Sequence, residues 1–138
     1  MDLSTAFQNI HWIAVIVATL AAFFIGWLWH SPLLFGKVWQ KEVGLSQDKM
    51  KSGNMPLIFG TTFVLNLIAS ILMAMFLGKE STLQAGLQAG MFVGIGWVAT
   101  SFGTTYLFTQ KSFRLFLIDA GYYACWYTVI GGILGVWK

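Results

Sequence analysis

Residues 10–29 read IHWIAVIVATLAAFFIGWLW, a stretch without a single Asp, Glu, Lys or Arg. An α-helix rises about 1.5 Å per residue, so roughly 20 apolar residues are enough to cross the hydrocarbon core of a bilayer. This stretch therefore predicts a membrane-spanning helix. Other stretches of the chain are similarly apolar and poor in charge.

The composition of the whole chain excludes an ordinary soluble domain. Of its 138 residues, 57% are hydrophobic and only 9% are charged, whereas charged residues make up about 25% of a typical soluble domain. The net charge of +3 is not gathered in a stripe of Lys and Arg, so no nucleic-acid partner is expected. The one cysteine, Cys125, excludes an internal disulfide framework and a multi-cysteine metal site.

Four windows poor in charge predict four spanning helices, which we place at about residues 10–29, 57–77, 83–105 and 115–136. Only the last window contains a charged residue, Asp119, within its limits. We therefore expect an all-α, integral membrane four-helix bundle that forms a single domain over residues 1–138.

The cations are distributed unevenly between the predicted loops. Six of the eight lie in the loops that follow spans one and three, and the other two, Lys79 and Lys138, lie on the opposite side. Lys and Arg in short loops are retained in the cytoplasm, so both chain termini are expected outside, in a multi-pass topology.

A different kind of helix is predicted between spans one and two. In residues 32–45 apolar side chains recur at helical spacing, while lysines occupy another side. We expect a short amphipathic helix in the membrane interface, with lysines at anionic headgroups and aromatic rings at the acyl boundary. A helix that binds a protein partner would show the same pattern. The predicted anchoring residues are Phe35, Lys37, Trp39 and Lys41.

Small residues one turn apart predict the faces through which the helices pack. In lipid, helices associate by close backbone approach, which small residues permit. Three rows exceed the needs of one short bundle, so we also expect a homo-oligomer. The first span has Ala14, Ala18, Ala22 and Gly26; the third has Gly86, Gly90 and Gly94; the fourth has Gly121, Cys125, Thr128, Gly132 and Gly135.

Asp119 is the strongest candidate for chemistry. It lies roughly 7–8 Å into the last span, where a carboxylate must be paired, hydrated or protonated. A nearby histidine could accept and release protons, because imidazole titrates near neutrality. The alternative is structural: Asp119 anchors a helix end, and the other polar groups bond within or between helices. The predicted binding or proton site comprises Asp119, His30, Asn66, Tyr123 and Thr104.

The sequence offers little equipment for metal binding or catalysis. His11 and His30 are about 28 Å apart on one predicted helix, so they cannot share an ion within one chain. There is no Gly-rich phosphate loop, nucleophile elbow or pair of carboxylates at catalytic spacing. We therefore expect no metal, no cofactor and a non-enzymatic role.

Four segments carry a resemblance to a known family: residues 9–15, residues 26–39 with the run Ser31-Pro-Leu-Leu-Phe-Gly-Lys, residues 116–123 and residues 131–137. Over nearly the whole chain they resemble the small bacterial membrane proteins catalogued as domain-of-unknown-function family 1761. His30 departs from the family pattern, which has Trp or Tyr before the Ser-Pro pair. The resemblance implies a four-span protein of the bacterial inner membrane and supplies no catalytic residue.

Two functions remain open at the level of sequence. The first is a non-enzymatic, self-associating accessory protein, or one that holds a lipid or small hydrophobic molecule between its helices. Its partners would be membrane lipids, further copies of the chain or another membrane protein. The alternative is a small proton-coupled transporter or channel centred on Asp119.

Overall fold

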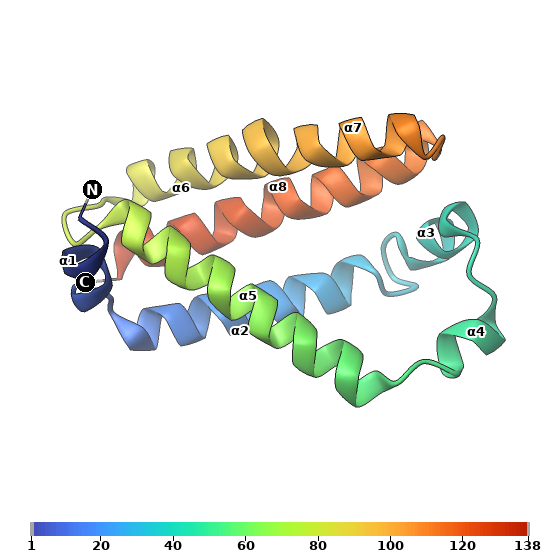
Figure 1. The fold of residues 1–138 in the computed structure, drawn as a ribbon, viewed down its shortest axis with the longest axis horizontal. Helices are drawn as coiled ribbons and strands as arrows, with labels where there is room; N and C mark the ends of the chain where they lie inside the picture. Colours follow the sequence, from blue (N-terminus) through green and yellow to red (C-terminus); the bar gives the residue numbers. More distant parts are fainter. Residues whose placement is uncertain (1, 138) are drawn as a thin grey trace.

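The computed structural model describes residues 2–137, and within that range the chain is helical with no strand (Figure 1). The prediction of an all-α fold is confirmed. The elements are α1 Leu3–Gln8, α2 Trp12–Trp29, α3 Gly36–Val43, α4 Gln47–Lys51, α5 Met55–Leu77, α6 Leu83–Met91, η1 Phe92–Ala99, α7 Thr100–Phe108 and α8 Phe113–Val136.

In the part of the chain that the structure describes, three helices are long and apolar enough to cross a membrane. They are α2, α5 and the continuous helix from Leu83 to Phe108 that is formed by α6, η1 and α7. The region predicted as the fourth span forms α8, which is 24 residues long. It is less apolar than the others, because it carries Arg114, Asp119 and several tyrosines, and by composition alone it falls outside this set.

Helix α8 lies at the centre of the structure. It packs against α2, against α5 and along the α6–α7 helix (Figure 1), and it buries more residues than any other element. Trp126 and Ile130 of α8 meet Val15 and Ala18 of α2 in the main apolar core. The outer faces of the other long helices expose large apolar side chains, which is typical of a surface that contacts lipid.

The closest approach between helices joins α6 to α8. Gly86 faces Gly131, and a Cβ added to either residue would lie within 3.0 Å of the backbone of the other. Gly90 and Gly94 lie against the α8 backbone in the same way. A side chain at these positions would separate the helices, so glycine is required there by the packing.

The π-helical segment η1 changes the face that the third long helix presents to α8. Gly94 and Gly103 both lie against α8, although nine residues of ideal α-helix would place them on opposite sides at about 100° per residue. A π turn holds more residues than an α turn. Ala99, which is buried between them, stands five positions after Gly94, and this longer step restores the contact with α8.

The two ends of the molecule differ in what they carry. At one end, the terminal end, the two ends of the chain lie beside α1; at the other, the α3 end, lie α3, α4 and the α7–α8 turn (Figure 1). α1 begins at Asp2, which accepts hydrogen bonds from the Ser4 N–H and the Thr5 hydroxyl. This short helix was not predicted. The helix predicted over residues 32–45 is shorter, because residues 31–35 form a turn.

Candidate functional site

A tight turn places α3 against the end of α2. The Gly36 N–H donates to the Ser31 carbonyl at 2.9 Å, and a Cβ at Gly36 would clash with the backbone of His30 and Ser31. At its other end α3 stops at Gly44, whose φ of 82° is left-handed and suits glycine. These two glycines fix the direction and the length of α3.

Asp119 is the polar centre of the α3 end. It is buried, with 8% of its surface exposed, and its carboxylate oxygens accept hydrogen bonds from two other elements. The Trp39 indole N–H of α3 donates at 3.1 Å, and the Tyr106 hydroxyl of α7 donates at 2.5 Å. Hydrogen bonds to a carboxylate are stronger than neutral ones, so Asp119 joins α3, α7 and α8.

Further aromatic rings pack around Trp39, one of the two donors to this carboxylate. The imidazole of His30 lies edge-on to Trp39, with ring centroids 5.2 Å apart, and to Tyr122, at 5.0 Å. The Nδ1 atom of His30 is 3.0 Å from the Gly26 carbonyl; because a carbonyl only accepts, this nitrogen carries the proton. We call Asp119, Trp39, Tyr106, His30 and Tyr122 the Asp119 cluster.

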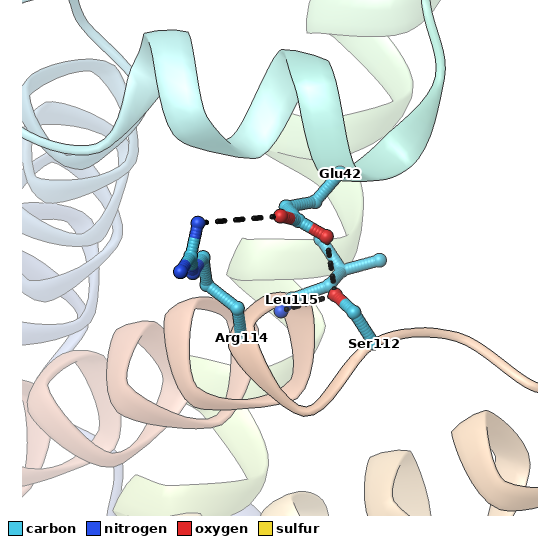
Figure 2. A network of polar contacts seen from close by, with 4 residues as sticks. All are labelled: Glu42, Ser112, Arg114 and Leu115. Carbon is cyan, nitrogen blue, oxygen red and sulfur yellow. Dashed lines mark hydrogen bonds and ion pairs between the residues drawn. The ribbon is translucent and has the colours of Figure 1, made fainter.

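Figure 2 shows a second link between α3 and α8. Glu42 accepts a hydrogen bond from the Ser112 hydroxyl at 2.6 Å and lies 3.7 Å from the guanidinium of Arg114. The Ser112 oxygen in turn accepts from the Leu115 N–H and caps α8. Because the Arg114 side chain is 69% exposed, the ion pair itself contributes little, and the hydrogen-bonded cap is the main part of this link.

The structure brings together only part of the predicted polar site. His30 lies in the Asp119 cluster, and Tyr123 packs beside it, stacked on Phe102 with centroids 5.2 Å apart. Thr104 is exposed, and its hydroxyl bonds to a carbonyl of its own helix. Asn66 is buried on α5 with its amide nitrogen unpartnered, and no hydrogen bond of the described residues joins it to Asp119.

Two residues of the cluster were not predicted to bind Asp119. Trp39 was expected at the acyl boundary, and Tyr106 was not among the predicted site residues. A signal for Tyr106 did exist, because a short connection between two helices places the end of one beside the start of the next. Of the other residues predicted to anchor α3, Lys37 and Lys41 are exposed. Phe35 packs on Trp29, with ring centroids 4.8 Å apart.

Of the residues predicted to pack helices, the alanines and glycines lie at contacts within the described chain, whereas Cys125 is exposed. The alanines of α2 are buried, and each glycine faces a neighbouring helix. The helix faces with small residues, from which we expected a homo-oligomer, therefore make their contacts within one chain. The contacts are Ala14, Ala18 and Ala22 in the core, Gly26 at Tyr122, Gly86 at Gly131, Gly90 at Tyr127, Gly94 at Ala124, Gly121 at Trp29, Gly132 at Leu87, and Gly135 at Thr82.

Hollows of the surface lie at both ends of the molecule. One of about 430 Å³ at the terminal end is lined by His11, Trp137 and their neighbours, and one of about 540 Å³ beside the α7–α8 turn is lined by Tyr106, Lys111, Phe116 and their neighbours. Asp119 lines neither of them. Within residues 2–137 no three His, Cys, Asp or Glu side chains gather as a metal site would require.

Comparison with known proteins places the chain in a family but assigns it no activity. No curated protein and no solved structure matches it. The sequence profile described as "Protein of unknown function (DUF1761)" matches residues 13–135, a range that includes the whole Asp119 cluster. The chain therefore belongs to the DUF1761 family of proteins of unknown function.

Proposed function

We propose that this protein is a non-enzymatic, multi-pass membrane protein that binds anionic phospholipid headgroups through a fixed surface at its α3 end. The observation that carries the proposal is the orientation of α3. Its inner side is held by the hydrogen bonds of Trp39 with Asp119 and of Glu42 with Ser112, while Lys37 and Lys41 on its other side are exposed.

Exposed apolar residues accompany these lysines. Leu33 is 78% exposed, and Leu34 and Val38 also face outward. Lysines beside exposed apolar side chains are typical of helices that lie in the headgroup region, and each cation near an anionic membrane surface contributes about 1 kcal/mol. We call Leu33, Leu34, Lys37, Val38 and Lys41 the headgroup surface.

The positions of the chain ends support a four-span topology. Three helices are long and apolar enough to cross a membrane, and three crossings would leave the two termini on opposite sides. Both ends instead lie at one end of the molecule (Figure 1), which supports α8 as a fourth crossing. The excess of cations at the α3 end favours the cytoplasmic side for this end and an outside position for the termini. We assign the membrane as the bacterial inner membrane by the family resemblance.

The alternative function, proton-coupled transport centred on Asp119, requires a carboxylate that reaches water. Both oxygens of Asp119 accept hydrogen bonds from the protein, and this favours a joining role for the residue. Self-association, or binding of another membrane protein, would use the same exposed side of α3.

Lipid retention tests the proposal. The protein is purified from mixed membranes, and the bound phosphatidylglycerol and phosphatidylethanolamine are quantified by mass spectrometry. The double variant Lys37→Gln/Lys41→Gln is expected to lose the enrichment of phosphatidylglycerol. The matched control, Lys49→Gln/Lys51→Gln, removes the same charge from α4 and is expected to retain it.

Two outcomes would contradict the proposal. Equal loss in both double variants would indicate a general effect of charge, and unchanged enrichment in both would show that the headgroup surface binds no anionic lipid. A protein that copurifies with the wild type and is lost only from the α3 variant, without a change in lipid, would favour a protein partner instead.

A further inference from the structure

Among residues 2–137, three polar side-chain atoms in the interior of the helix packing have no hydrogen-bond partner. They are Nδ2 of Asn66, Oγ of Ser70 and Nε1 of Trp126, and all three residues are more than nine-tenths buried. An unpartnered polar group inside a core covered by lipid is strongly unfavourable. Each of these atoms therefore points to a bound group that supplies the missing hydrogen bond.

The three atoms belong to two helices that pack against each other, α5 and α8. Asn66 and Ser70 are one turn apart on the buried face of α5, which also carries Met73, and Met73 belongs to the same core cluster as Trp126 of α8. Both helices run toward the terminal end (Figure 1). Counted back from their last residues, Asn66 lies about 16 Å and Trp126 about 15 Å deep, so they stand at one level.

The chemistry of the three groups specifies what can join them. An amide N–H₂ and an indole N–H are both donors only, so Asn66 Nδ2 and Trp126 Nε1 cannot satisfy each other. One oxygen that accepts two hydrogen bonds and donates one would satisfy all three groups, and water has this capacity. Thr19, also buried, shows the contrast: its hydroxyl donates to the Val15 carbonyl at 2.8 Å and requires no ligand.

We infer that an ordered water molecule is held between α5 and α8, where it accepts hydrogen bonds from Asn66 and Trp126 and donates one to Ser70. This interior site is separate from the headgroup surface and does not depend on the proposed function. In the competing arrangement no water is bound between the two helices. If the Asn66 amide rotates by 180°, its oxygen accepts the Trp126 indole N–H directly.

Water-selective NMR of the full chain distinguishes the two arrangements. Protein labelled with ¹⁵N at its tryptophans is studied in deuterated detergent, and cross-relaxation from water to each indole proton is recorded by NOE and ROE. The signal of Trp126 is assigned by its loss in Trp126→Phe or, if that variant does not fold, by elimination with Phe variants of each of the other tryptophans. A long-lived water gives Trp126 a cross-peak of opposite sign in the two spectra.

Two variants and an internal reference complete the test. Trp29, whose indole donates to the Ile118 carbonyl at 3.0 Å, is expected to show no such peak. The Trp126 peak should persist in Ser70→Ala, because two donors still hold the water, and should be lost in Asn66→Leu. Absence of the peak in the wild type would overturn the inference. Its loss in Ser70→Ala would do so too, because the peak would then come from exchange of the Ser70 hydroxyl proton with solvent and not from a bound water.

Discussion

Trp39 and Asp119, 80 positions apart in the chain, are joined by a hydrogen bond in which the indole N–H donates to the carboxylate at 3.1 Å. The bond connects a short surface helix to the central helix α8. Because the carboxylate is buried, its hydrogen bonds replace those it would make with water. The position of α3, with its lysines outward, therefore depends on this contact.

Trp39→Phe should release α3 from α8. The substitution keeps a ring and removes only the donor, and a hydrogen bond to a charged group is worth about 1.5–3 kcal/mol. We expect a loss of this size in the free energy of unfolding and faster proteolysis between residues 31 and 55. Trp27→Phe, at a side chain 62% exposed, is the control, and equal behaviour of the two variants would contradict the prediction.

Asp119→Asn should act on the same contact. Asparagine offers one acceptor oxygen to the two donors Trp39 and Tyr106, so we expect a destabilisation of about 1–3 kcal/mol together with faster proteolysis of the α3 segment. Proton flux into liposomes is measured on the same samples. A variant that keeps the wild-type proteolysis pattern but abolishes a proton flux would instead support the transporter alternative.

Gly131→Ala should separate α6 from α8. The added Cβ would meet the Gly86 backbone, which cannot move without shifting a whole helix, and overpacking of this kind costs about 1–3 kcal/mol. Gly60→Ala is the matched control, because a Cβ there meets nothing within 4 Å and alanine at such a helical site gains about 0.4–1 kcal/mol. Opposite shifts of the unfolding midpoint are expected, and a midpoint unchanged in Gly131→Ala would show that the helices are not in contact.

The start of α1 should depend on pH. Hydrogen bonds from the Thr5 side chain and then the Ser4 N–H hold the pKa of Asp2 below its usual value. Because the pKa is lowered, the Asp2 cap stabilises α1 fully at pH values above the ordinary carboxyl pKa. This stabilisation is lost as the pH falls through the lowered pKa of Asp2. The amide chemical shifts of Ser4 and Ala6 should follow this titration. Asp2→Asn, which keeps an acceptor but does not titrate, should abolish the pH dependence.

The positions of the long helices could be predicted because burying a charge in lipid is costly. The windows without Asp, Glu, Lys or Arg end within about three residues of α2, α5 and the α6–α7 helix. The start of α3 could not be predicted in this way. It depends on the turn that brings Gly36 against the backbone of His30 and Ser31, and a hydrophobic period does not show such a contact. α1 is too short to show a hydrophobic period.

The composition of the Asp119 cluster could be predicted less well, and η1 is the main reason. A regular period of 3.6 residues placed Thr104 toward the site, whereas the five-residue step inside η1 rotates α7 so that Tyr106 faces Asp119. Nothing local in residues 92–99 requires a π-helix. The close packing of Gly94 on one side of the step and Gly103 on the other depends on α8, and that information lies in another part of the chain.

The central place of α8 has a consequence for how the protein is made. Helices α2, α5 and α6–α7 are synthesised before α8, and they are the ones apolar enough to enter a bilayer by themselves. Trp39 and Tyr106, the two hydrogen-bond donors to Asp119, both precede it in the chain and are therefore made before it. The least apolar long helix is thus the last to be made, after the helices that cover it, and a chain truncated before residue 113 would leave the glycine faces of α6 uncovered.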